Sequence, residues 1–230
     1  MNILPIIIPV YNEKNTIREL VDKVKQVNLV HNFSQEIIVV DDGSTDGTRD
    51  ILPALSGVKL IYHEHNPGKG AAIRTGIKEC TGNYIIIQDA DLEYNPNDFN
   101  LLLEKAVSED LPVVYGSREL KTQHNRYCNL SFYLGGLFLT KLTNLLYAQK
   151  ITDEATCYKL FKADLLKSLP LHCNRFEFCP EVTARVAKKG IKIPEVGISY
   201  YPRHKSEGKK INWRDGLEAI WTLIKYKFVK

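Results

Sequence analysis

The sequence YIIIQDADLE, residues 84–93, passes from an apolar run into an acidic segment that carries Asp89, Asp91 and Glu93. In an extended chain, side chains two positions apart lie on the same face. The three carboxylates are therefore expected to point into one space at the end of a buried strand. Carboxylates placed so closely repel one another unless a cation lies between them, and Mg²⁺ or Mn²⁺ suits oxygen ligands that also meet phosphates. A strand that simply ends in a solvated acidic loop is the alternative.

Apolar runs alternate with helical patterns over the first 120 residues. The expected strands are 3–10, 36–40, 58–62, 84–88 and 112–116, and the expected helices are 16–27, 48–55, 66–80 and 97–108. This alternation predicts an α/β fold with a mostly parallel sheet flanked by helices. Ligands of such sheets bind beyond the carboxyl ends of the strands.

Polar motifs follow four of the expected strands directly. They are Tyr11-Asn12-Glu13, Asp41-Asp42, Asp89-Ala90-Asp91 and Ser117-Arg118. Since parallel strands end at the same edge of a sheet, these motifs should meet there. This convergence favours the metal-site interpretation over the solvated loop.

The pattern changes after residue 120. The expected elements are a polar, mobile segment at 121–126, helices at 130–147, 163–169, 180–189 and 213–228, a compact polar segment at 152–159, and an edge strand at 191–200. We expect one continuous domain with two halves, 1–120 and 121–230. The last helix carries an apolar stripe of Trp213, Leu217, Ile220, Trp221, Ile224 and Phe228. Packing of that stripe on the domain is favoured slightly over contact with a membrane interface.

Several basic and turn-forming residues have two interpretations. Gly68-Lys69-Gly70 lacks the spacing of a Walker phosphate loop, so a plain helix start is favoured over a phosphate role. His63 and His65 are expected in a loop rather than as ligands. Arg118 is expected near a bound diphosphate. The basic loop 203–210, which includes Arg203 and Lys209, is either solvated or closes over a substrate anion.

The composition is that of a soluble globular protein, with 44% apolar and 25% charged residues among 230. A net charge of +4 favours anionic ligands or a membrane surface and does not call for nucleic acid. The five scattered cysteines include no Cys-x-x-Cys pair, which fits a reducing cytoplasm. With no signal peptide and no apolar run of about 18 residues, we expect a cytoplasmic protein that lies on a membrane where it meets one.

The motifs, in their order along the chain, together resemble glycosyltransferase family 2, and within it the dolichyl- or polyprenyl-phosphate sugar synthases. The resemblance rests on 6–13, 39–48, Gly68-Lys69-Gly70, Asp89-Ala90-Asp91 and Gly116-Ser117-Arg118, and continues less sharply through 152–159 and the 203–209 loop. It implies a glycosyltransferase A-type, Rossmann-like fold and a GDP- or UDP-sugar donor. It also implies a polyprenyl phosphate acceptor, Mg²⁺ or Mn²⁺ as cofactor, and a single inverting displacement.

The resemblance also implies roles for individual residues. Those expected to line the donor site are Pro9, Tyr11, Glu13, Val40, Asp42, Lys69 and Ala90. Asp89 and Asp91 would hold the metal, with Glu93 standing where close relatives commonly have Gln. Arg118, Arg203 and Lys209 would bind the diphosphate or the acceptor phosphate.

The acceptor decides whether a general base is needed. A phosphate acceptor is already ionised at neutral pH, whereas a hydroxyl acceptor must lose a proton. For a hydroxyl acceptor, Asp153 and Glu154 are the candidate bases, against the alternative that they cap a turn. The residues proposed as catalytic are thus Asp91, Arg118 and Asp153. Transfer to a hydroxyl, a nucleotidyltransferase and a catalytically silent nucleotide-sugar-binding module are the competing functions.

Overall fold

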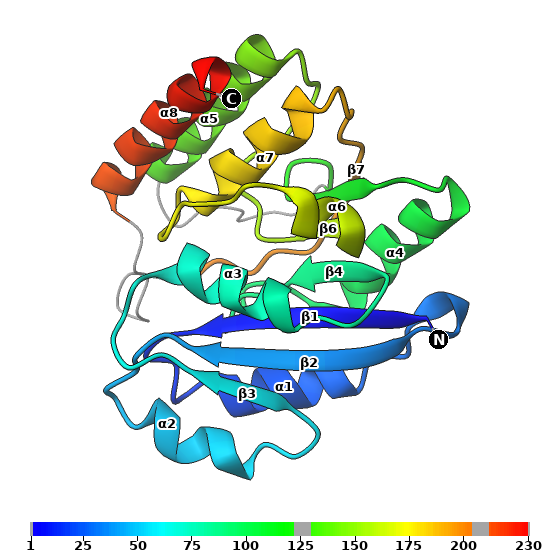
Figure 1. The fold of residues 1–230 in the computed structure, drawn as a ribbon, viewed down its shortest axis with the longest axis vertical. Coiled ribbons are helices and arrows are strands. Elements are labelled where there is room, and N and C mark those ends of the chain that lie inside the picture. Colours follow the sequence, from blue (N-terminus) through cyan, green and yellow to red (C-terminus); the bar gives the residue numbers. More distant parts are fainter. Residues whose placement is uncertain (1, 122–129, 204–211, 230) are drawn as a thin grey trace.

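A seven-stranded sheet forms the centre of the computed structural model, which describes residues 2–121, 130–203 and 212–229 (Figure 1). The strands are β1 (Ile3–Val10), β2 (Ser34–Asp41), β3 (Lys59–Tyr62), β4 (Tyr84–Ile87), β5 (Val113–Ser117), β6 (Lys159–Lys162) and β7 (Glu195–Gly197). The α-helices are α1 (Ile17–Lys25), α2 (Thr48–Ile51), α3 (Lys69–Glu79), α4 (Phe99–Ser108), α5 (Leu130–Tyr147), α6 (Ala163–Ser168), α7 (Phe178–Lys188) and α8 (Trp213–Phe228). The α/β class and the flanking helices are as expected.

The sheet runs in the order β3-β2-β1-β4-β6-β5-β7 and is parallel except at β6. Its central strands are continuous apolar runs because helices cover them from both sides. β1 and β2 pair in register along their whole length, so Pro9 lies beside Val40 at their carboxyl ends. The mostly parallel sheet is therefore confirmed, and the loops after β1, β2 and β4 meet at one edge.

Residues 152–158 form a turn-rich segment as expected, but the sequence prediction missed β6 directly after it, which pairs antiparallel with both β4 and β5. Its first residue, Lys159, is fully buried and its ammonium donates to the carbonyl oxygens of Glu154 and Thr156. These bonds satisfy a buried charge without a salt bridge. The expected edge strand 191–200 shortens to β7, which lies parallel to β5.

A second, smaller core lies between α5, α7 and α8, apart from the main core around the sheet. Its buried members are Leu139, Tyr147, Ala184, Ala219, Leu223 and Tyr226. The hydroxyl of Tyr147 donates to the carbonyl oxygen of Leu223 at 2.6 Å, and the Asn212 capping box fixes the start of α8. The C-terminal helix is therefore docked on the domain.

α8 packs through a different face from the one that its sequence suggested. Ala219, Leu223 and Tyr226 are buried, whereas most of the predicted apolar stripe is exposed. A helix can bury only the side that meets a neighbour, and α5 and α7 meet the face with the smaller side chains. Over the described ranges, no helix is both long and apolar enough to cross a membrane.

Candidate active site at the carboxyl edge of the sheet

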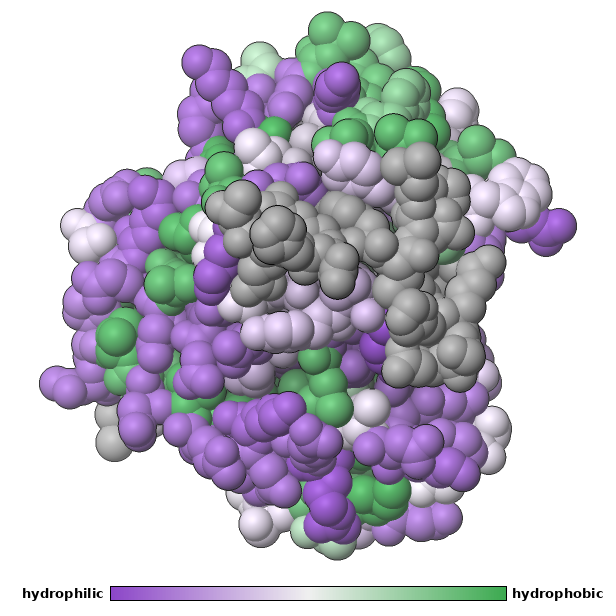
Figure 2. Space-filling model, turned by 180° about the vertical axis from the view of Figure 1, so that it is seen from behind, coloured by the Kyte–Doolittle hydropathy of each residue, from purple (hydrophilic) through white to green (hydrophobic). Residues whose placement is uncertain are grey.

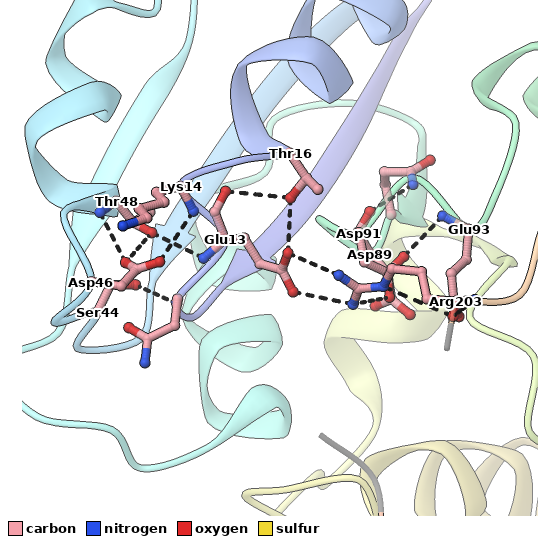
Figure 3. A network of polar contacts seen from close by, with 12 residues as sticks. Glu13, Lys14, Thr16, Ser44, Asp46, Thr48, Asp89, Asp91, Glu93 and Arg203 are labelled. Carbon is pink, nitrogen blue, oxygen red and sulfur yellow. Dashed lines mark hydrogen bonds and ion pairs between the residues drawn. The ribbon is translucent and has the colours of Figure 1, made fainter. Parts of the chain in front are cut away.

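The loops that follow β1 and β2 are joined to each other by hydrogen bonds (Figure 3). Asn12 has a positive φ of 52°, which turns its backbone N–H to the hydroxyl of Ser44 at 2.9 Å. The side chain of Asn12 accepts from the N–H of Thr45, and the N–H of Glu13 donates to the hydroxyl of Thr48. Short polar side chains thus hold the two predicted donor loops in one fixed arrangement.

Asp42 lies almost fully buried where these loops meet the start of α3. Its carboxylate accepts from the backbone N–H of Gly68 at 2.9 Å and lies 2.8 Å from Nδ1 of His63. Gly68 has a φ of +119°, and a Cβ there would lie 2.5 Å from the carbonyl oxygen of Asn174. Only glycine allows this close approach. α3 begins at Lys69, so the helix start expected at Gly68-Lys69-Gly70 is present.

His63 lies in the loop after β3, as expected, but its ring makes contacts that the sequence interpretation did not predict. Its ring lies between the carboxylate of Asp42 and the hydroxyl of Thr75, with Nε2 3.0 Å from that oxygen. His65, by contrast, is exposed as expected. The available signal was positional: His63 directly follows β3, which pairs with β2 just before Asp42.

The carboxylates of residues 89–93 do not share one face. β4 ends at Ile87, and Leu92 adopts a positive φ of 63°, so the chain turns and the expected alternation is lost. Asp89 lies 2.5 Å from the ammonium of Lys69, and Asp91 lies 3.1 Å from the guanidinium of Arg203. Glu93 instead accepts from the hydroxyl of Tyr200 and the backbone N–H of Arg203. The expected alternation of an extended chain is therefore absent, although all three carboxylates still lie around Lys69 and Arg203.

Arg203 links the two sides of the site, as Figure 3 shows. Its guanidinium nitrogens lie 3.2 Å from both carboxylate oxygens of Glu13 and also bond Asp91. Burial, together with Asp89 and Glu93, raises the pKa of Asp91 to about 7, although Arg203 opposes this. Among the described residues, the neighbouring cations therefore compensate Asp91 incompletely.

The charges of this cluster bear on whether a metal fits. Among the described residues, four carboxylates (Glu13, Asp89, Asp91 and Glu93) face two cations (Lys69 and Arg203), an excess of two negative charges. No group of three His, Cys, Asp or Glu side chains within those residues is placed to hold a metal by itself. A hard divalent ion that takes its other ligands from a diphosphate and water needs only one or two carboxylates. Asp89 and Asp91 fit such an ion, whereas Glu93 accepts hydrogen bonds from Tyr200 and from the backbone of Arg203.

Arg118 and Asp153 lie together, as a buried pair bonded through two parallel contacts. Nε and Nη2 of Arg118 donate to the two oxygens of Asp153 at 2.6 and 2.7 Å, and the backbone N–H of Arg118 adds a third bond. Burial opposes ionisation of Asp153, but Arg118 outweighs it and lowers the pKa of that carboxyl. A carboxylate held in this way is a weak proton acceptor.

Glu154 is fully buried beside this pair, and burial raises its pKa. One of its oxygens accepts from the hydroxyl of Thr183 at 3.2 Å. Tyr200 is a contact that the sequence interpretation missed: its ring stacks below the guanidinium of Arg118 at 4.9 Å while its hydroxyl bonds Glu93. It thus connects the Arg118–Asp153 pair to the carboxylate cluster.

The remaining predicted site residues have mixed positions. Tyr11 is half-buried at the end of β1, and Ala90 is buried in the turn after β4. Lys209 lies outside the described residues, as does most of the segment 121–126 that was expected to be mobile.

Comparison with known proteins places this chain in a family. The model of glycosyl transferase family 2 matches residues 6–169. A UDP-N-acetylglucosamine–dolichyl-phosphate N-acetylglucosaminyltransferase of Methanococcus voltae is 29% identical over 246 residues, covering 98% of this chain and 96% of that protein. A dolichyl-phosphate beta-glucosyltransferase of Dictyostelium discoideum is 29% identical over 86% of this chain and 66% of its own length.

The solved structures include a glucosyl-3-phosphoglycerate synthase from Mycobacterium tuberculosis in complex with Mn²⁺, UDP and phosphoglyceric acid. It superposes with a TM-score of 0.72 at 20% identity, over 100% of this chain and 80% of that one. At this identity the likeness concerns the fold, and it confirms the expected glycosyltransferase A-type architecture.

Proposed function

The chain belongs to glycosyl transferase family 2 and is a glycosyltransferase, and from this premise we propose that it transfers a sugar from a UDP-sugar to a polyprenyl phosphate with inversion at the anomeric carbon. The observation that carries the proposal is the carboxyl edge of the sheet, where buried Asp42 bonds the backbone N–H of Gly68 and the next residue, Lys69, pairs with Asp89, near Asp91 and Arg203. The names of two relatives, which act on dolichyl phosphate, support the acceptor class.

The donor is proposed to bind across the loops after β1 and β2. Pro9, Tyr11 and Val40 form the apolar side of a base pocket, and Asp42 is a buried acceptor for an N–H of the base. A pyrimidine such as uracil carries such an N–H, and each carboxylate oxygen can accept more than one hydrogen bond. This supports UDP, which both the archaeal relative's name and the solved complex mention.

The diphosphate is proposed to extend from this pocket to the carboxylate cluster. Mg²⁺ or Mn²⁺ bound by Asp89 and Asp91 would supply the positive charge that stabilises the departing nucleoside diphosphate. Lys69 and Arg203 already lie against these carboxylates and provide further positive charge for the phosphates. Lys209 is proposed to join them, and Glu13, bonded to Arg203, positions that side chain.

The acceptor is proposed to approach from the side of Arg118. A polyprenyl phosphate oxygen attacks the anomeric carbon, the bond to the nucleoside diphosphate breaks, and the configuration inverts. Because the acceptor is ionised, no proton has to be removed. Arg118 offers the N–H groups that Asp153 leaves unoccupied, and Asp153 orients them. The reaction would take place at the cytoplasmic face of a membrane, where such a lipid is presented.

Transfer to a soluble hydroxyl acceptor is the second candidate, because the solved neighbour is bound to phosphoglyceric acid. This reaction needs a base, and the lowered pKa of Asp153 together with the full burial of Glu154 weighs against both proposed bases. A nucleotidyltransferase is disfavoured by membership in this family. A silent sugar-nucleotide-binding module differs from the proposal only in turnover.

A donor and acceptor screen tests the proposal directly. Purified protein is incubated with UDP-glucose, UDP-N-acetylglucosamine or GDP-mannose, with Mn²⁺ or EDTA, and with short-chain polyprenyl phosphate or phosphoglyceric acid. We expect a glycosylated polyprenyl phosphate from a UDP-sugar, formed only with the metal and detected by mass spectrometry. Transfer to phosphoglyceric acid alone, or nucleotide binding without any transfer, would contradict the proposal.

A further inference from the structure

We propose that the exposed faces of α5 and α8 form a surface that docks on an anionic lipid bilayer. The surface is called here the apolar face and consists of Leu134, Phe138 and Leu145 of α5 with Trp213, Leu217, Trp221, Ile224 and Phe228 of α8. The inference that the bilayer presents the acceptor rests on the proposed function. The inference that this surface contacts lipid rests only on the exposed side chains described below.

The spacing of these residues places each set on one side of its helix. Successive members on α8 are three or four positions apart, and those on α5 follow the same period, with Lys141 filling the gap between Phe138 and Leu145. The side chains of Trp213, Trp221 and Phe228 are 70%, 64% and 80% exposed. On α8 the stripe runs for about 22 Å at 1.5 Å per residue.

Packing among the described residues does not account for the apolar face. α8 meets α5 and α7 through Ala219, Leu223 and Tyr226, which are buried on its other side. Figure 2 shows apolar side chains gathered over this corner of the molecule, whereas hydrophilic side chains dominate most of the rest of that view. Soluble proteins rarely expose large contiguous apolar patches except at interaction sites.

The charge along the border of this face favours a bilayer with anionic lipids. Arg214 and Lys225 border the stripe on one side of α8 and Lys227 on the other, while Lys141 lies within the α5 set. Glu218 is the exposed acidic residue on the described part of α8. Tryptophan and phenylalanine flanked by basic residues are typical of helices that lie in a membrane interface, and basic residues are attracted to anionic headgroups.

The position of the two helices relates this surface to the site. α5 and α8 pack side by side, and Figure 1 shows both beginning on the side of the molecule toward which β1 and β2 point. This is the side that carries the donor loops and the carboxylate cluster. A lipid held at this surface would therefore present its phosphate on the side of the molecule that carries the site.

Vesicle flotation without nucleotide or acceptor tests the surface independently of catalysis. The wild-type chain is expected to float with phosphatidylglycerol-containing vesicles and much less with phosphatidylcholine alone. The double variant Trp221→Ser/Phe228→Ser is expected to lose at least tenfold in partitioning to both. Arg214→Gln/Lys225→Gln is expected to lose only the preference for anionic vesicles. The control Leu101→Ser, at a 43% exposed leucine on α4, should bind like the wild type.

A second copy of the chain is the competing occupant. Light scattering measures the oligomeric state of the same proteins. A wild-type chain that is dimeric and does not float, together with a monomeric Trp221→Ser/Phe228→Ser variant, would overturn the proposal. Equal flotation of the wild type and that double variant would overturn it as well. Thermal melting confirms that each variant is folded.

Activity measurements separate this inference from the proposed function. The Trp221→Ser/Phe228→Ser variant should keep wild-type rates on a short, water-soluble prenyl phosphate and lose at least tenfold on a long-chain acceptor in vesicles. Equal losses on both acceptors would overturn the docking role. A wild-type chain that floats but transfers sugar to neither acceptor would instead refute the acceptor class and leave the lipid contact in place.

Discussion

Two groups of opposite charges lie at the carboxyl edge of the sheet, and they differ in how completely they are compensated. Asp153 is matched by one guanidinium through two short bonds, and its pKa is lowered. Asp91 shares Arg203 with Glu13, and its pKa is raised to about 7, chiefly by burial and then by its acidic neighbours. The first arrangement is closed and suits a structural or orienting role. The second is open and suits binding of a further cation.

The strongest way to break this comparison is Asp91→Asn. If the open cluster holds the metal, this variant should lose about 10³-fold in transfer rate, since metal stabilisation of a leaving group contributes several kcal/mol. The fold should remain intact because the wild-type carboxylate is already under-compensated in the folded state. Initial rates and thermal melting measure the two effects.

A matched control for Asp91→Asn is Asp110→Asn. It removes an exposed carboxylate that pairs with Lys162 and is not part of the carboxylate cluster. It should leave the rate unchanged. A wild-type rate in Asp91→Asn would show that the cluster is not the metal site.

Disrupting the Arg118–Asp153 pair should lower the free energy of unfolding. Asp153→Asn leaves the buried guanidinium of Arg118 without its counter-charge, and breaking a buried pair from one side costs about 3–5 kcal/mol. Urea unfolding followed by circular dichroism measures this cost. Asp110→Asn, with its carboxylate 90% exposed, should cost no more than about 1 kcal/mol. Similar losses in both variants would mean that the Arg118–Asp153 pair contributes no more than a surface pair.

The sequence predicted which segments meet at this edge but not how their charges are shared. Alternation of strands and helices located five strands correctly, since those strands are long or continuous apolar runs. β6 was missed because its two apolar residues lie between lysines, and its first residue, Lys159, is a buried charge satisfied by carbonyl oxygens from the preceding turn. The period-two argument failed at Leu92, whose positive φ no alternating pattern indicates.

The C-terminal helix is a second case in which the sequence predicted the element but not its contacts. Periodicity located α8 and its stripe, but which side is buried depends on α5 and α7, which are distant in the sequence. The partners of Arg203 could not be predicted from local sequence either, because they lie more than 100 positions away in the chain. Local patterns predict elements and strand ends, whereas pairing across the edge requires the fold.

His63 extends the comparison to the proposed donor site, where the carboxylate of Asp42 contacts an imidazole ring. His63→Ala removes the contact to Asp42, and we expect about tenfold weaker UDP binding, equivalent to about 1.4 kcal/mol. His63→Asn retains a donor and should recover part of the affinity. Isothermal titration calorimetry measures both.

The control for His63 is His65→Ala, at an exposed residue two positions further along. It should bind UDP like the wild type. If His63→Ala binds UDP equally well, Asp42 does not need this ring to meet the base.

Glu93→Gln gives the smallest expected effect and sharpens the comparison within the open cluster. One oxygen of Glu93 accepts from the Tyr200 hydroxyl at 2.9 Å and the other from the Arg203 N–H at 2.8 Å. The amide oxygen of glutamine can preserve one of these bonds, and its NH₂ cannot accept the other. We therefore expect a loss of stability of about 1 kcal/mol and Mn²⁺ affinity within about threefold of the wild type, which is less than 0.7 kcal/mol. Electron paramagnetic resonance of free Mn²⁺ in the presence of UDP measures the affinity. A loss of Mn²⁺ affinity as large as that measured for Asp91→Asn would place Glu93 among the metal ligands. Anchoring the 200–203 segment needs hydrogen-bond acceptors but not a negative charge.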